Sequence, residues 1–84
     1  KPALDIAAED RVLWEALRAR RRQLAQEQGV PPYVIFHDST LLEMLNQKPV
    51  SLPEMSNISG VGQTKLGRYG ADFLDLISDY LAGD

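Results

Sequence analysis

The stretch Ile58-Ser59-Gly60-Val61-Gly62-Gln63-Thr64-Lys65 places two glycines around one apolar residue, directly before a long amphipathic segment. Glycine lets the chain turn sharply, so a break in helical structure is predicted over residues 58–62. After the break, apolar residues recur at helical spacing up to Leu81. The predicted helix spans about 63–81, and its buried stripe comprises Leu66, Tyr69, Phe73, Ile77, Tyr80 and Leu81. Before the break, Ser51 and Glu54 have capping-box spacing and predict a short helix that ends near Asn57.

Three further helical pieces are predicted toward the N-terminus. A long one runs from about Glu9 to Gln28 and is ended by Gly29 and the two prolines that follow. The short apolar segment 33–36 has no partner strand, so it is interpreted as one helical turn or as an extended plug in the core. Thr40 and Glu43 have capping-box spacing and predict a helix over 41–47, which Pro49 ends. The predicted core of these pieces contains Leu13, Leu17, Leu24, Phe36, Leu41, Leu45 and, at its margin, Trp14.

We therefore expect an all-α fold of five helical pieces over residues 9–82, with residues 1–8 as a linker or a frayed helix start. The chain has 84 residues, a net charge of −3, no cysteine and a single histidine. The missing cysteines exclude a disulfide scaffold and a thiolate metal site. No segment approaches the roughly 18 consecutive apolar residues of a membrane span. We expect a cytoplasmic piece of a longer protein.

No set of residues predicts an enzyme. His37, Asp38 and Ser39 are adjacent, whereas the side chains of a catalytic triad converge from separate elements. They are interpreted as a loop histidine followed by two capping residues of the next helix. Asp72, Asp75 and Asp79 share one helical face, which is interpreted as a solvated surface in preference to a metal site. No phosphate-binding loop is present. We expect neither catalysis nor a metal or other cofactor in this domain.

The glycine break has two interpretations. It resembles helix–hairpin–helix phosphate binders, in which unpaired amide groups at a helix start hold a phosphate. Alternatively, the glycines only turn the chain between packed helices. Lys65 and Arg68 lie near the start of the last helix and three aspartates lie toward its end, an order that opposes the helix dipole and favours an anionic ligand. Tyr33 has two interpretations as well, a base-stacking residue or a core aromatic.

The first long helix carries a basic cluster. Residues 11–22 contain five arginines and one glutamate. Arg11, Arg18 and Arg22 share an outer face with Glu15, which is able to pair with the first two. Arg20 and Arg21 are expected over the edge of the core with their charged heads in water.

Seven motifs occur in a fixed order along the chain: Leu13-Trp14-Glu15-Ala16-Leu17-Arg18, Gly29-Val30-Pro31-Pro32-Tyr33-Val34-Ile35-Phe36, Asp38-Ser39-Thr40-Leu41, Pro53-Glu54-Met55, Gly60-Val61-Gly62, Lys65-Leu66 and Arg68-Tyr69-Gly70. Together they resemble the HRDC domain, named for helicase and ribonuclease D C-terminal. The combination is most similar to HRDC domains of RecQ-type DNA helicases. The resemblance implies a five-helix fold and an accessory role in DNA repair and recombination, within a parent that uses ATP and Mg. It also implies binding of single-stranded or branched DNA through Tyr33, Lys65 and Arg68, with Arg18, Arg21 and Arg22 as weaker candidates. The glycine break adds Gly60, Val61, Gly62, Gln63 and Thr64 through its own likeness to phosphate binders, and the net negative charge predicts that the binding is weak.

Two functions remain open at this point. The first is DNA binding that tunes the helicase. The second is docking of the acidic face, Asp72, Asp75 and Asp79, on the helicase core or another protein without DNA contact. RNA processing in a ribonuclease D context ranks below both. If the parent is bacterial, it is expected to be associated with the nucleoid.

Overall fold

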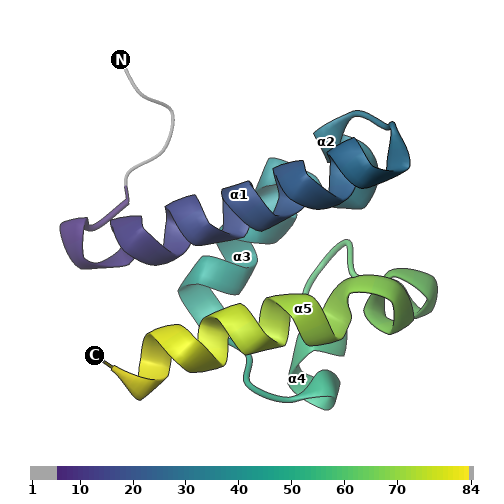
Figure 1. The fold of residues 1–84 in the computed structure, drawn as a ribbon. Coiled ribbons are helices and arrows are strands. Elements are labelled where there is room, and N and C mark those ends of the chain that lie inside the picture. The colour runs from purple at the N-terminus through teal and green to yellow at the C-terminus, as the bar shows by residue number, and fades with distance from the viewer. Residues whose placement is uncertain (1–5, 84) are drawn as a thin grey trace.

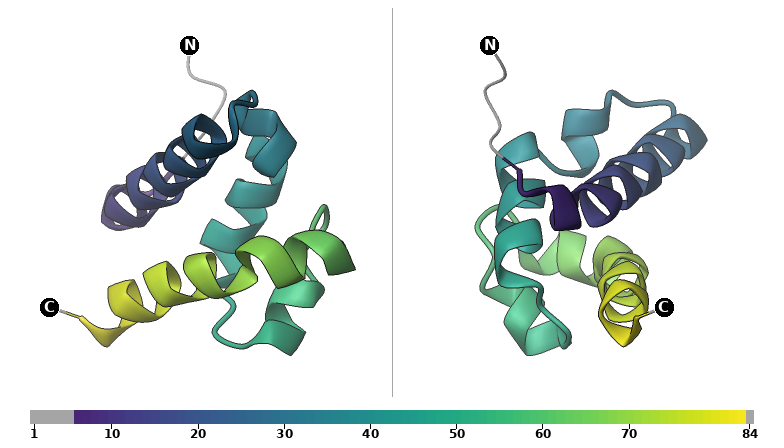
Figure 2. Two further views of the ribbon diagram at one scale, coloured as in Figure 1. Left: turned by 45° about the vertical axis from the view of Figure 1, so that its right-hand side comes forward. Right: turned by 90° about the vertical axis from the view of Figure 1, so that its left-hand side faces the viewer.

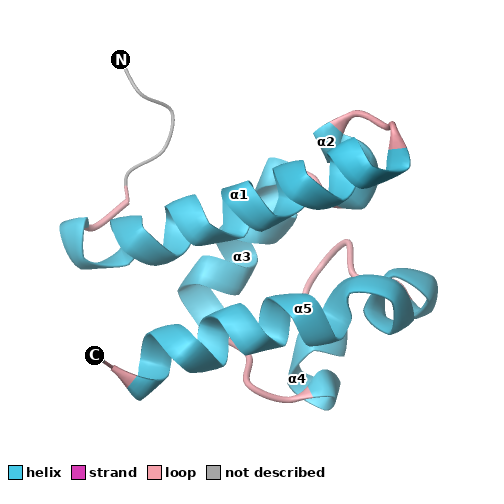
Figure 3. Ribbon diagram, in the orientation of Figure 1, coloured by secondary structure: helices cyan, strands magenta, loops and turns pink. Residues whose placement is uncertain are grey.

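A computed structural model describes residues 6–83, and within that range the chain forms one 3-10 turn and five α-helices with no strand (Figure 3). The predicted all-α class is therefore confirmed. The 3-10 turn η1 spans Ala8–Asp10. Of the segment 1–8 that was expected to be a linker, residues 1–5 lie outside the described residues.

Helix α1 (Arg11–Gln28) ends at the predicted glycine. Gly29 has a φ of 67° and forms a left-handed cap, in which its N–H donates to the carbonyls of Ala25 and Gln26. Pro31 then caps the single helical turn α2 (Pro32–Ile35), which confirms the interpretation of this segment as one helical turn. Phe36 follows in an extended conformation and is buried.

Helix α3 (Asp38–Gln47) begins before the predicted start at Leu41. The capping box proposed for Thr40 and Glu43 is wrong, because Thr40 lies inside the helix and is buried. Its hydroxyl donates to the Ser59 carbonyl at 2.9 Å, and Glu43 Oε1 accepts from the Ser59 N–H at 3.2 Å. Both side chains therefore hold the glycine loop rather than cap a helix.

The helices on either side of the glycine loop are close to their predicted limits. They are α4 (Leu52–Ser56) and α5 (Gln63–Ala82). The Ser51 side chain accepts from the Glu54 N–H at 3.3 Å, which confirms Ser51 as the cap of α4. The Glu54 carboxylate accepts from the Val50 N–H at 2.9 Å, one residue before the partner that a capping box predicts.

The helices enclose one core. Helices α1 and α5 lie side by side and run in opposite directions (Figure 1), and α1 also contacts α2 and α3 while α4 packs on α5. Figure 2 shows α3, in teal, running from the α2 turn toward α4 and passing beside both long helices. Phe36 meets Phe73 edge to face at 5.2 Å between ring centroids and Tyr69 at 5.9 Å. The short segment after α2 is thus the plug that joins α1 to α5.

Most predicted core residues are buried, and the exceptions are on α5. Leu66 and Tyr80 are only half-buried, and Leu81 is 49% exposed. The prediction for Leu81 is wrong, because this side chain at the end of α5 does not pack against the core. None of the helices in the described part of the chain is long and apolar enough to cross a membrane.

Candidate nucleic-acid interface

The glycine loop is held against α3 by close contact. Gly60 has a φ of 90°, and a Cβ at this position would collide with the Thr40 hydroxyl. A glycine is therefore required here both by the backbone conformation and by the lack of space. Val61 is buried beside it and anchors the loop in the core. The loop consequently presents backbone, not side chains, at its tip.

The start of α5 offers unpaired amide groups. Gly62 is the N-cap and makes no side-chain cap bond. The first helical bond joins the Leu66 N–H to the Gly62 carbonyl at 2.8 Å. The N–H groups of the first helical residues, Gln63 to Lys65, therefore have no partner within the helix. Gln63 and Thr64 are exposed, so an anion has access to this end.

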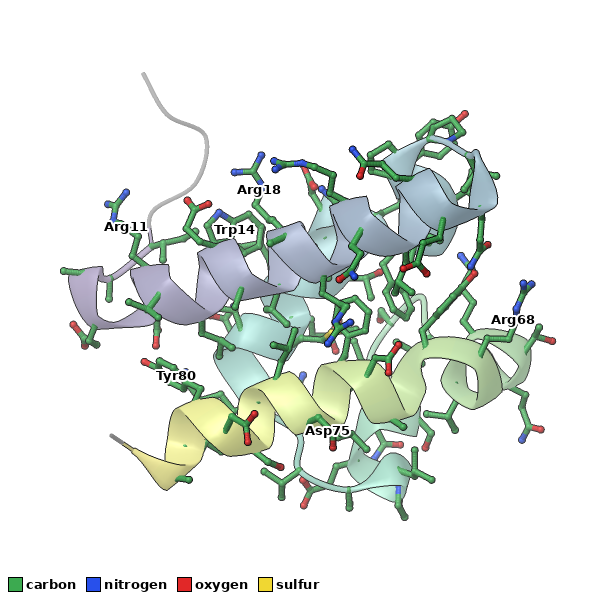
Figure 4. The ribbon with its side chains drawn as sticks, in the orientation of Figure 1. Arg11, Trp14, Arg18, Arg68, Asp75 and Tyr80 are labelled. Atoms are coloured by element: carbon green, nitrogen blue, oxygen red, sulfur yellow. The ribbon has the colours of Figure 1, made fainter. Side chains whose placement is uncertain are left out.

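Two cations flank these amides. Lys65 is half-buried, with Nζ 5.8 Å from the centroid of the Phe36 ring. Arg68 is exposed, and its guanidinium lies 5.5 Å from the centroid of the Tyr69 ring. Among residues 6–83 neither takes part in an ion pair. Figure 4 shows Arg68 at the end of the molecule where α5 begins.

Tyr33 lies at the same end of the molecule. It is 58% exposed, so of its two interpretations the core aromatic is wrong. Helix α2, which carries Tyr33, lies beside the C-terminal end of α1 (Figure 1), and the ring of Phe36, which follows α2, has Lys65 Nζ 5.8 Å from its centroid. The His37 ring is nearly parallel to the Tyr33 ring, at 21° and 5.9 Å between centroids. An exposed aromatic surface thus stands near the basic start of α5.

Arg21 does not have the environment that its sequence position suggests. It is 9% exposed, and its NH1 group donates to the Phe36 carbonyl at 2.9 Å and pairs with Asp38 Oδ1 at 2.8 Å. The expectation that its head lies in water is wrong, because the turn between α2 and α3 folds over this side of α1. Its Nε is buried without a partner in the described part of the chain. Arg21 is therefore a structural link between α1 and the α2–α3 turn.

The remaining arginines of α1 form a stripe away from α5. Figure 4 shows Arg11 and Arg18 pointing from the outer side of α1. The Arg18 guanidinium lies 5.8 Å from the centroid of the Trp14 ring, and Arg22 is exposed. The expected pairing of Glu15 with Arg11 and Arg18 is absent among residues 6–83, where the ion pairs are Arg21–Asp38 and Lys48–Asp10.

The acidic end of α5 lies apart from the basic start. Asp75 and Asp79 are exposed and Asp72 is half-buried, and none has an ion-pair partner within residues 6–83. In the same range no three acidic or histidine side chains are placed to hold a metal ion. Beside Asp79 lies an apolar pocket of about 270 Å³, lined by Val12, Leu13, Ala16, Leu76 and Tyr80.

Sequence reasoning missed two contributions to this region. His37 was considered only as a loop residue, but it pairs with Tyr33. Asp38 was considered only as a cap, but it forms an ion pair with Arg21, 17 positions earlier. Neither the helical nor the strand repeat brings residues at this separation together. The Pro-Pro-Tyr turn left the exposure of Tyr33 open, and no local pattern predicted these two contacts.

The arrangement of an exposed tyrosine, a glycine loop and a basic helix start agrees with a family match. Residues 10–77 match the family model described as the HRDC domain. The chain belongs to the HRDC family. The predicted resemblance is therefore confirmed, and so is its RecQ type, as the relatives below show.

This HRDC chain is similar to parts of several helicases. It is 48% identical over 82 residues to the ATP-dependent DNA helicase RecQ of Bacillus subtilis, covering 95% of this chain and 14% of that protein. It is 43% identical over 77 residues to RecQ of Haemophilus influenzae, covering 92% and 12%. It is also 38% identical over 68 residues to the helicase UvrD2 of Mycobacterium tuberculosis, covering 81% and 10%. The chain thus spans about a seventh of the first relative's length.

A solved structure has the same fold. HRDC domain 3 of Deinococcus radiodurans RecQ superposes with a TM-score of 0.83 at 35% identity, covering 88% of this chain and 97% of that one. Because nearly all of that domain is matched, the described helices make up a whole HRDC fold.

Proposed function

We propose that this HRDC domain binds single-stranded or branched DNA weakly and thereby tunes substrate binding and unwinding by a RecQ-type DNA helicase in repair and recombination. The domain itself has no catalytic role in this proposal and needs no cofactor. ATP and Mg are used by the helicase core of the parent chain.

One observation carries the proposal: an exposed tyrosine and the open, basic start of α5 lie at one end of the molecule. Tyr33 offers an exposed ring, with one face against His37 and the other open for stacking on a base. The amides of 63–65, Lys65 and Arg68 offer positive charge to the adjoining phosphate. These groups hold a backbone without reading its bases, so the binding is non-specific in this respect. Few contacts and a net charge of −3 keep the dissociation constant at roughly 10⁻⁵–10⁻³ M at physiological salt.

The proposal is tested by titrating a labelled single strand with the chain and with Lys65→Ala, Arg68→Ala. This double variant is expected to abolish measurable binding. Arg11→Ala, Arg20→Ala is the control, because it also removes two positive charges but leaves the α5 start intact. Equal loss in both variants would show a general charge effect and contradict the proposed site.

A second measurement locates the contact. Backbone amide shifts on adding the strand are expected to concentrate at Tyr33, at residues 60–65 and at Arg68. Shifts confined to residues 72–83 would place the ligand on the acidic end and overturn the assignment.

The apolar pocket beside Asp79 favours a second candidate, docking on the helicase core of the same chain. Val12 in that pocket is 72% exposed, and Asp79 at its edge supplies negative charge, with Asp75 one turn earlier on α5. A basic surface with one apolar side chain would fit both features. In this candidate, Asp75→Asn with Asp79→Asn changes the DNA affinity or ATPase rate of the intact helicase. In the DNA-binding proposal, the Lys65 and Arg68 pair is the sensitive one.

A further inference from the structure

The corner between α2 and α3 contains a pocket that the proposed function does not fully use. Its volume is about 470 Å³, and it is lined by Arg21, Pro32, Tyr33, His37, Asp38 and Ser39. The base-stacking ring of Tyr33 therefore borders the same space as a carboxylate. The His37 ring lies against one face of Tyr33, so a base would stack on the other face, beside this space.

The Asp38 carboxylate is held in place before any ligand arrives. Its Oδ1 lies 2.8 Å from NH1 of Arg21, and the same nitrogen donates to the Phe36 carbonyl at 2.9 Å. Arg21 is itself buried, so the pair has little freedom to move. The Asp38 side chain is nonetheless 66% exposed, and its Oδ2 has no partner among residues 6–83. A fixed carboxylate with a free oxygen is a preorganised hydrogen-bond acceptor.

The charge of Arg21 also makes this carboxylate compatible with a nucleic acid. Alone, Asp38 would repel a phosphate backbone. The adjacent guanidinium offsets its charge, so the penalty at the distance of a phosphate is reduced. What remains locally is the ability of the carboxylate to accept hydrogen bonds.

We propose that this pocket makes single-strand binding selective for guanine, with Tyr33 stacking on the base and Asp38 accepting from its Watson–Crick edge. This inference rests on the proposed function, since it assigns a base preference to the same tyrosine. Guanine carries two adjacent donors, N1–H and the 2-amino group. They match the two oxygens of the Asp38 carboxylate, because Oδ2 is free and Oδ1 keeps a second lone pair beside its bond to Arg21. Adenine and cytosine offer one amino group beside a ring nitrogen that is an acceptor. Thymine offers one N–H between two carbonyl oxygens, and these oxygens repel the oxygens of a carboxylate.

The test compares strands that differ at one base. Labelled thymidine 10-mers with a single central dG, dI, dA, dC or dT are titrated with the chain at constant salt. Inosine keeps N1–H and lacks only the 2-amino group, so it isolates one of the two proposed bonds. The dG strand is expected to bind about fivefold tighter than the dT strand, with the dI strand between them. This ratio is at the low end of the range for a bidentate contact, because the site is open to water.

Two variants assign the preference to Asp38. Asp38→Asn keeps an oxygen for Arg21 and replaces the free acceptor by a donor, so it is expected to bring the dG to dT ratio near one. Glu27→Gln also removes one negative charge, from an exposed side chain on α1, and is expected to keep the ratio. This control separates base recognition from a general gain in affinity.

The outcomes distinguish the two proposals. If all five strands bind equally and Tyr33→Ala weakens them all, the guanine preference is overturned while the DNA-binding function stands. If dG and dI bind equally tightly, the bidentate contact is overturned. If no strand binds, the proposed function fails and the guanine preference fails with it. The strand comparison uses the unaltered chain, so it decides even if Asp38→Asn does not fold.

Discussion

Gly60 fixes the position at which the loop between α4 and α5 touches α3. Its left-handed φ of 90° is strained for other residues, and the Thr40 hydroxyl fills the space where a Cβ would stand. Thr40 in turn donates to the neighbouring Ser59 carbonyl. The tip of the proposed DNA-binding loop is therefore set by one glycine and one buried hydroxyl.

Gly60→Ala is expected to lower the free energy of unfolding by about 1–3 kcal/mol, because the alanine must either strain the backbone or displace Thr40. Gly62→Ala is the control. Gly62 has a φ of −77° and nothing within 4 Å of an added Cβ, so its cost is expected to stay under about 1 kcal/mol. Urea unfolding of both variants measures the difference, and equal losses would contradict the role of Gly60.

Helix α5 is stabilised mainly by its middle turns. Phe73 is fully buried and meets Phe36 edge to face, whereas Leu81 near the end of the helix is 49% exposed. The N-terminal turn η1 is tied to this last part of α5 instead by hydrogen bonds. Tyr80 donates to the Glu9 carbonyl at 2.6 Å, and its hydroxyl lies 3.3 Å from Asp10 Oδ1.

Phe73→Ala is expected to cost about 3–5 kcal/mol, because it leaves a cavity in the centre of a small core. Leu81→Ala on the same helix is expected to cost under about 1 kcal/mol, since half of that side chain is already in water. Urea unfolding measures both. A loss below 1 kcal/mol for Phe73→Ala would mean that the stripe of α5 is assigned wrongly.

The Tyr80 contact predicts a dependence on alkaline pH. Burial raises the pKa of the Tyr80 hydroxyl above its usual 10.0, and the negative charge and hydrogen bond of Asp10 raise it further. The folded chain therefore keeps this proton to a higher pH than the unfolded chain. The free energy of unfolding is expected to fall as the pH rises past the usual tyrosine pKa of about 10 toward the folded value. Tyr80→Phe should show a shallower decline in urea unfolding across this pH range, and an unchanged decline would contradict the role of Tyr80.

The two ends of helix α5 carry opposite charges, so the molecule as a whole has a basic and an acidic end. Lys65 and Asp79 are 14 positions apart on one helix, which corresponds to about 21 Å along its axis. This distance is about 2.5 Debye lengths at physiological salt, so the basic and acidic ends act nearly independently. The separation allows one small domain to offer one end to DNA and the other to a protein.

Salt dependence reports how many cations touch the strand. If Lys65 and Arg68 each neutralise one phosphate, the logarithm of the association constant is expected to fall against the logarithm of salt concentration with a slope of about −1.4. Removing Arg68 alone should reduce the slope to about −0.7. Titrations between low and physiological salt measure both values. A slope that Arg68→Ala leaves unchanged would exclude a phosphate contact by this residue.

Local chemistry was sufficient for most of the helix limits. Gly29 ends α1 and Ser51 caps α4 because left-handed backbone and short-range capping bonds involve only neighbouring residues. The apolar spacing likewise predicted Phe73 and Ile77 as core, since a helical period decides which face is covered. The same reasoning failed at Thr40. The capping pattern is present there, but the hydroxyl donates instead to the carbonyl of Ser59, 19 positions away.

The sequence by itself determined the helices, their core faces and the charge order along α5, because each depends on residues a few positions apart. Only the tertiary structure decided that Tyr33 is exposed, that Arg21 is buried against Phe36 and Asp38, and that Phe36, which follows α2, lies beside Lys65 near the start of α5. These contacts join residues from 15 to about 30 positions apart, and no periodicity connects them. They form because α1, α3 and α5 share one small core, and packing around Phe36 then brings the Tyr33–Asp38 corner to the end of the molecule where α5 begins, away from the acidic end of α5.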